Sequence, residues 1–258
     1  MLQFSDDSLE DLKEDVDLCV DNLQDPACTL DYAGRFYEEA SEALRAHAIL
    51  SLLIRADSAG FSSGLVMSGY ARRAFLRRCL QQHYEDFYLA LSRSGSILDA
   101  VAGNDFSLAS EIFGLSPYAF RKGDEYEDDF HWHRILGLLF TGAPQEQLDA
   151  ALGALDAAAD GGGERLDVAK ALHTRNAEAF DEAFRVLISA QQAANAEEDA
   201  ADEEPAAAAG VYVFIEGIAV LKIARRLGIQ IEPEYPLCPT LALLDGPPMQ
   251  PGDEFAVP

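Results

Sequence analysis

The sequence predicts an all-α protein, a compact multi-helix bundle of antiparallel helices that ends in an extended, proline-rich C-terminal strap. Apolar residues recur at steps of three and four along most of the chain, which is the period of an amphipathic helix. Glycine and proline fall between these periodic segments and divide them into helix-sized pieces. Strand patterns are lacking, because Ile229, Ile231 and Tyr235 alternate with polar residues only among prolines and indicate an unpaired strap.

The first half of the chain is expected to hold three long helices and one short helix. The turn at Asp25–Pro26 ends the first, whose apolar stripe is flanked by a nearly all-acidic outer face. The glycines of Gly60–Gly64 predict a break before the third. In order, the expected helices cover Leu9–Leu23, Tyr32–Arg55, Leu65–Leu91 and the residues between Gly95 and Gly103.

The second half is expected to continue as helices of ordinary length. The helix after Gly123 should carry the acidic run into Leu139, and Pro144 suits the first turn of the next helix. The glycine triplet Gly161–Gly163 ends that helix, and Gly228 is placed as a helix-stop glycine. The remaining expected helices are Arg165–His173, Ala177–Ala193 and Val211–Leu227.

We interpret residues 1–258 as a single α-helical domain with a sub-boundary near 117–123. Residues 195–209 are built from Ala, Glu and Asp and predict an acidic low-complexity loop. The N-terminus is acidic, unlike a signal peptide, and the four cysteines are scattered without a C-x-x-C pair. These features predict a cytoplasmic protein with reduced thiols.

The charge is unevenly distributed. The chain has 45 acidic and 19 basic residues, a net charge of -26, and much of the acid lies in the blocks 6–31, 124–129 and 197–204. Such a charge repels nucleic acid and anionic membranes, and it favours association with a basic macromolecule. Solubility alone is the competing explanation, since runs of charge are often solvated surfaces.

Two patterns suggest an enzymatic function, but neither pattern is complete. Gly60–Gly64 matches the G-x-S-x-G nucleophile elbow but lacks the preceding strand that this motif requires. His131 and His133 follow a run of carboxylates and suggest a metal site. On a helix these two histidines point about 200° apart, so they cannot share a face. We therefore expect no catalytic residue, no cofactor and no bound metal.

Two sets of charged residues are expected to be structural. The arginine cluster at positions 72, 73, 77 and 78 has no wider basic surface around it, so we expect it to neutralise acids within the protein. Glu216 lies among apolar residues and must either pair with a cation such as an arginine or lie near a helix start.

The segment from Arg165 to Leu244 resembles the immunity protein 49 family of bacterial immunity proteins. The resemblance is carried by Asp181–Leu187 after the turn at Asn176–Phe180, and by Glu216–Ile231 followed by Glu234–Leu237. A second immunity family, which protects against DNase toxins, ends in a similar helix and tyrosine pattern. The resemblance implies an antitoxin-like protein that binds and neutralises a toxin and has no catalytic residues of its own.

With that resemblance, the acidic blocks become candidate contact surfaces for a basic toxin. The first candidate is the run at 124–129, with neighbouring aromatics as anchors. The second is the acidic face of the first helix. The candidate contact residues are Asp124, Glu125, Tyr126, Glu127, Asp128, Asp129, Trp132, Asp11, Asp15 and Asp21. The alternatives are a helical-repeat scaffold and, less favoured, a metal-dependent hydrolase that uses His131 and His133.

Overall fold

The computed structural model describes residues 4–25, 27–93, 95–159, 163–197, 209–246 and 255. Over these residues the chain is helical and forms no β-strand, which confirms the predicted all-α class. No helix in this part of the chain is both long and apolar enough to cross a membrane. The four cysteines are free, and three of them are buried.

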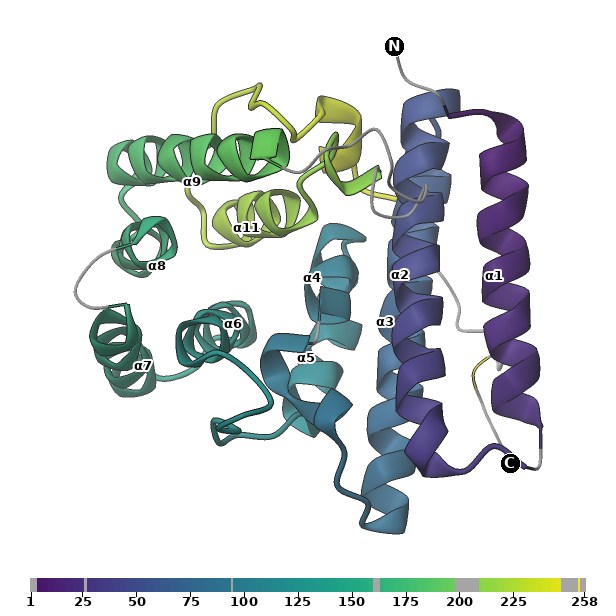
Figure 1. Cartoon of the computed structure of the whole chain (residues 1–258). Coiled ribbons are helices and arrows are strands. Elements are labelled where there is room, and N and C mark those ends of the chain that lie inside the picture. Colours follow the sequence, from purple (N-terminus) through teal and green to yellow (C-terminus); the bar gives the residue numbers. More distant parts are fainter. Residues whose placement is uncertain are drawn as a thin grey trace.

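Three long helices form one layer of the molecule (Figure 1). They are α1 (Asp6–Gln24), α2 (Leu30–Arg55) and α3 (Ser58–Gln82), and α2 packs between the other two. Ala56 adopts the left-handed conformation after α2, and the Asp57 carboxylate accepts the N–H of Gly60 at the start of α3. The predicted break at Gly60–Gly64 is therefore wrong, because the chain turns at residues 56–57 and these glycines lie inside α3.

The remaining helices occupy the other side of the molecule (Figure 1). The helix α4 (Gly95–Ala102) packs against both α3 and α11, so it lies between the layer of α1, α2 and α3 and the remaining helices. The helices beyond it are α5 (Phe106–Leu115), α6 (Glu127–Thr141), α7 (Gln145–Ala158), α8 (Glu164–Thr174), α9 (Ala177–Glu197) and α11 (Ile215–Arg226). Single 3-10 turns form at η1 (Phe87–Leu89), η2 (Leu91–Arg93) and η3 (Thr240–Leu243).

A buried ion pair fixes α4 against the long layer. Asp99 on α4 is fully buried, and both its carboxylate oxygens accept from Arg45 of α2, at 2.7 and 2.9 Å. Ser68 of α3 donates to the same carboxylate at 2.5 Å, and Ser96 lies 3.1 Å from the Ser68 hydroxyl. A buried carboxylate is tolerated only when its charge and lone pairs are satisfied in this way.

Several predicted boundaries shift in the structure. The third helix ends at Gln82 instead of Leu91, and α6 and α11 begin at Glu127 and Ile215, later than expected. Gly228 follows Leu227, the C-cap of α11, and its φ of 81° confirms it as the helix stop. Residues up to 197 of the predicted loop at 195–209 belong to α9, and 198–208 lie outside the described residues. So does the proline-rich end of the strap, apart from Phe255.

The packing of α6 against α5 gives a first prediction. A Cβ atom on Gly137 would overlap the buried ring of Phe113, whereas a Cβ on Gly153 of α7 would meet nothing within 4 Å. We expect Gly137→Ala to lower the free energy of unfolding by about 2 kcal/mol through overpacking. Gly153→Ala should raise it by about 0.5–1 kcal/mol, because alanine favours the helix. Urea denaturation of both variants measures the two effects. A Gly137→Ala protein with an unchanged free energy of unfolding would contradict the packing of Gly137 against Phe113.

Candidate functional site

The acidic run at 124–129 is divided between a turn and a helix. Asp124 and Glu125 lie in the turn before α6, and Glu127, Asp128 and Asp129 form the first turn of α6. Acidic residues are favoured in this first turn because they interact with the positive end of the helix dipole. The run therefore has a structural reason to be acidic, whatever it binds.

Three of its five carboxylates are engaged within the protein. Asp124 accepts from Arg121 Nε at 2.9 Å, and Asp129 accepts from Arg165 Nη1 at 2.5 Å. Glu125 accepts the backbone N–H groups of Ser92 and Arg121, at 2.9 and 3.0 Å. These contacts hold the turn in place. Of the other two carboxylates, Glu127 lies 3.8 Å from His131, and Asp128 has no hydrogen bond or ion pair with a described residue.

The neighbouring aromatic residues differ in exposure. Trp132 is fully buried and Phe130 is 3% exposed, so neither is available as an anchor for a partner. The predicted contact role of Trp132 is wrong for that reason, because α6 turns it into the core. Tyr126 is 78% exposed. The exposed part of this first candidate surface is Tyr126, Glu127 and Asp128.

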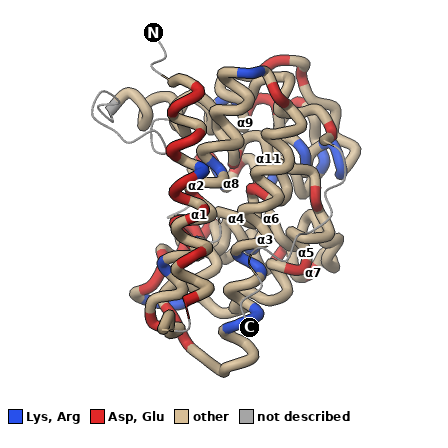
Figure 2. The backbone as a smooth tube through the Cα atoms, turned by 90° about the vertical axis from the view of Figure 1, so that its right-hand side faces the viewer, with Lys and Arg blue, Asp and Glu red and all other residues tan. Residues whose placement is uncertain are grey.

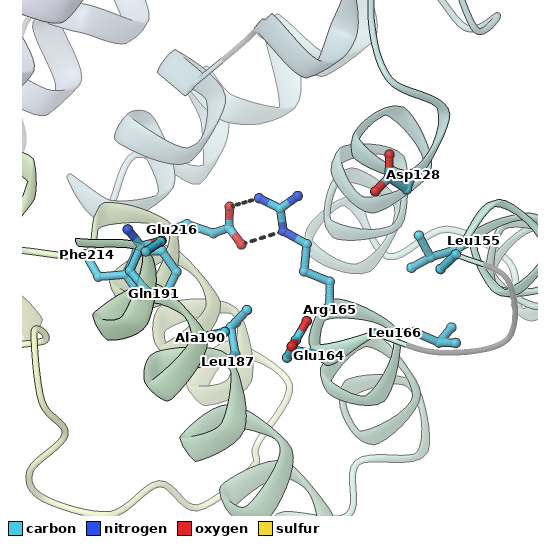
Figure 3. Close-up of a pocket in the computed structure, with 13 residues that line it drawn as sticks. Asp128, Leu155, Glu164, Arg165, Leu166, Leu187, Ala190, Gln191, Phe214 and Glu216 are labelled. Carbon is cyan, nitrogen blue, oxygen red and sulfur yellow. Dashed lines mark hydrogen bonds and ion pairs between the residues drawn. The ribbon is translucent and has the colours of Figure 1, made fainter. Parts of the chain in front are cut away.

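Beside Asp128 lies a cavity of about 420 Å³, formed by the end of α7 and by α6, α8, α9 and α11 (Figure 3). Arg165 of α8 crosses it and donates to both oxygens of Glu216, at 3.0 and 2.7 Å. Glu216 is the second residue of α11, so it lies at a helix start. It also has an arginine partner, and the sequence predicted each of these arrangements as a possibility. Glu164 adds a further carboxylate to the lining.

The Arg165 guanidinium is shared by two carboxylates. Burial by itself would lower the pKa of Arg165, but the charges of Glu216 and Asp129 outweigh it and raise that pKa above the ordinary value. Beneath the pair, His133 is buried and its Nδ1 lies 2.9 Å from the carbonyl oxygen of Asp129. Burial lowers the pKa of His133, so the ring is neutral near pH 7. The fixed charge of Arg165 thus joins α6, α8 and α11.

The helix α1 carries the most extended acidic surface of the described residues. Figure 2 shows acidic residues on successive turns of α1. Asp6 pairs with Arg55 at 2.6 Å, but seven other carboxylates of the helix are exposed and form no ion pair with a described residue. They are Asp7, Glu10, Asp11, Glu14, Asp15, Asp17 and Asp21. Among them Leu18 is 61% exposed, so an apolar side chain stands within the acidic face.

The arrangement of the described residues does not support the catalytic alternatives. His131 lies 3.8 Å from Glu127 on the half-buried side of α6, whereas His133 points into the core. Among the described residues no three His, Cys, Asp or Glu side chains are grouped as a metal would require. The serine of the G-x-S-x-G pattern, Ser62, is buried inside α3 and donates to the carbonyl of Gly103 at 2.6 Å.

The arginine cluster of α3 is used inside the protein. Arg72 is 3% exposed and donates to backbone carbonyls of Tyr88, Leu89 and Ala90. Arg73 and Arg77 both pair with Glu111 of α5. The expectation of an internal role is therefore confirmed for these three, and Arg72 binds backbone carbonyl groups in this role.

A comparison with family models decides the relationship. The model described as Immunity protein 49 matches residues 36–241. The chain belongs to this family. The match to the immunity protein 49 family extends well beyond Arg165–Leu244, the segment in which the sequence resemblance was recognised. It includes Arg165, Glu216 and the acidic run of α6, and it begins in α2, so α1 lies outside the matched segment.

The searches of curated proteins and of solved structures gave no match. The immunity protein 49 family model is therefore the comparison on which the relationship rests.

The shared arginine gives a second prediction. Arg165→Met leaves Glu216, whose side chain is 13% exposed, without its cation. We expect a loss of about 3 kcal/mol in the free energy of unfolding, at the low end for a broken buried pair because Arg165 is partly exposed. Arg165→Met with Glu216→Gln should recover part of this loss, since the unpaired charge is then removed. The matched control is Arg35→Met, which breaks the exposed pair with Glu39 and should have a far smaller effect. Equal losses in the two arginine variants would contradict the structural role.

Proposed function

We propose that this chain is an immunity protein that binds a toxin in the cytoplasm and neutralises it by stoichiometric contact, without catalysis of its own. Membership of the immunity protein 49 family supports the class of function. The uncompensated acidic face of α1 supports the kind of partner, a toxin domain with a basic surface. Opposite charges accelerate diffusional encounter and suppress wrong partners.

The face of α1 is the better candidate for the main contact surface. Its seven carboxylates form no ion pair with a described residue, whereas three of the five acids at 124–129 are engaged by internal hydrogen bonds. Asp11, Asp15, Leu18 and Asp21 recur at steps of three and four, so they share one outward face. An exposed leucine ringed by charge fits the usual arrangement of a contact surface, in which an apolar centre is surrounded by polar residues.

The exposed edge at Tyr126, Glu127 and Asp128 is the second candidate. Figure 1 places α1 on one side of α4 and α6 on the other, so a small partner domain would contact one surface or the other. This edge has an exposed aromatic ring, which suits an anchor, but only two exposed carboxylates, one of which lies beside His131. Its position within the matched segment of the family is the observation in its favour.

The third prediction concerns association kinetics with the protein encoded beside this gene. Asp11→Lys with Asp15→Lys should lower the association rate constant roughly tenfold at low salt and reduce its salt dependence, because steering depends on the local charge. Stopped-flow measurements over a range of ionic strength provide the test. The matched control is Glu178→Lys with Glu182→Lys on α9, which changes the net charge equally at two exposed sites.

Equal effects of these two double variants would mean that only net charge matters, and the α1 surface would be rejected. If Glu127→Lys with Asp128→Lys slows association and the α1 variant does not, the contact lies at α6. A neighbouring protein that is not bound at all, or whose toxicity is unaffected by this chain, would reject the proposed function.

The fourth prediction separates affinity from steering. Leu18→Ser should raise the dissociation rate constant of the complex several-fold and leave the association rate constant nearly unchanged, because an exposed apolar residue contributes to short-range contact. Protein stability should change little, since 61% of this residue is already in solvent. Surface plasmon resonance measures both rate constants, with the exposed Val186→Ser of α9 as the control. An unchanged dissociation rate would exclude Leu18 from the interface.

A further inference from the structure

A second cavity, of about 860 Å³, lies between the start of α5, the end of α11 and the segment after η3. Its wall contains three cationic side chains, Lys222, Arg225 and Arg226, and two carboxylates, Asp105 and Asp245. Positive charge therefore exceeds negative charge at this wall, in a chain whose net charge is -26. A locally basic cavity in so acidic a protein requires an explanation.

Lys222 is the buried member of the group. It is 4% exposed, and its Nζ donates to the carbonyl oxygen of Leu244 at 3.5 Å. No carboxylate of the described residues lies within ion-pair distance of it. Burial lowers the pKa of Lys222 to about 8, and the charge of Asp245 only partly opposes this. A buried ammonium group normally has an anionic partner, so Lys222 favours the binding of an anion at this wall.

The two arginines lie at the exposed rim of the same cavity. Arg225 donates one N–H to the carbonyl of Leu243 at 2.9 Å, and the guanidinium of Arg226 lies over the ring of Phe106, 4.6 Å from its centre. A guanidinium has five N–H donors in a planar fork, and these contacts leave donors that can bind the oxygens of a phosphate group.

The start of α5 adds a further attraction for an anion. Phe106 and Ser107 line the cavity and form the first turn of this ten-residue helix, whose N–H groups have no intrahelical acceptor. Asp105 caps the helix by accepting the N–H of Leu108 at 2.9 Å, so its carboxylate is already engaged. The N-terminal end of a helix next to cationic side chains is a favourable environment for a phosphate.

We propose that this cavity binds a small molecule through a phosphate group, with Lys222 at its buried end and Arg225 and Arg226 at its rim. Three cations and a helix start suit a group with two negative charges better than a single carboxylate. The volume lies within the range of sites for small ligands and exceeds what one phosphate ion fills. The site is separate from the α1 face, so the proposal does not depend on toxin binding.

The test is isothermal titration calorimetry of the full chain with inorganic phosphate, pyrophosphate and adenosine monophosphate at pH 7. We expect at least one of the three to bind, and Lys222→Met to weaken that binding at least tenfold. Lys170→Met removes an exposed lysine of α8 outside this cavity and should change nothing. Tighter binding of adenosine monophosphate than of phosphate would indicate a nucleotide-like ligand, and the reverse would indicate the free ion.

Methionine resembles the lysine side chain in length and removes a buried charge that has no ion pair, so Lys222→Met should fold. Should it fail to fold, Arg226→Gln at the exposed rim takes its place, with a several-fold weakening expected. No binding of any of the three probes by the wild-type chain at about 10 mM would overturn the proposal. Equal weakening by Lys170→Met, or acetate binding as tightly as phosphate, would do the same.

A pH series provides a fifth prediction. Sulfate stays doubly charged between pH 7 and pH 10, so the charge of the anion is constant over the series. The other charged side chains at the cavity wall are Asp105, Asp245, Arg225 and Arg226. Lys222 loses its proton as the pH rises past about 8, so sulfate binding should weaken several-fold by pH 10 in the wild type. In the Lys222→Met variant, the residual affinity for sulfate should not weaken in this way between pH 7 and pH 10. A wild-type affinity that is independent of pH would exclude Lys222 as a ligand of the anion.

Discussion

The pairing of Arg45 with Asp99 is the interaction on which the arrangement of the two sides depends. Asp99 is fully buried on α4, the short helix that lies between the layer of α1, α2 and α3 and the remaining helices. Its carboxylate receives Arg45 from α2 and Ser68 from α3, so any displacement of α4 would leave a charge unpaired in the core. The cost of such a charge, several kcal/mol, exceeds that of losing most single apolar contacts. The positions of the helices that pack on α4 therefore depend on the position of α4.

Basic residues are far fewer than acidic ones in this chain, and several arginines bind oxygen atoms inside it. Arg45, Arg72, Arg121 and Arg165 each bind buried or half-buried oxygen atoms that link separate helices and turns. The acids that these arginines engage are fixed by structure, which is why the run at 124–129 contributes less to the surface than its composition suggests. The acids of α1 have one basic neighbour on the helix, Lys13, and remain outward. The surface charge follows from where the few cations are placed.

Much of the fold could be predicted because helical periodicity is a local property. The spacing of Leu9, Leu12 and Leu23 anticipated α1, and the turn at Arg175–Asn176 separated α8 from α9 as expected. Boundaries were less accurate where caps decide them. Asp57 starts α3 by accepting the N–H of Gly60, although a glycine-containing segment had indicated a break. For Glu216 the need for an arginine was predictable from burial cost, but the identity of Arg165, 51 residues away in sequence, was not.

The sequence by itself determined the helical class, the acidic character and the resemblance to an immunity family, because composition, period and short motifs are readable without contacts. Only the tertiary structure decided which charges are free. It turned Trp132 into the core and engaged Asp124, Glu125 and Asp129 internally. Seven α1 carboxylates form no ion pair with a described residue. It also brought Lys222 beside the start of α5, more than a hundred residues earlier in the chain. Charge pairing depends on distances between helices, and these are set by packing of the whole core.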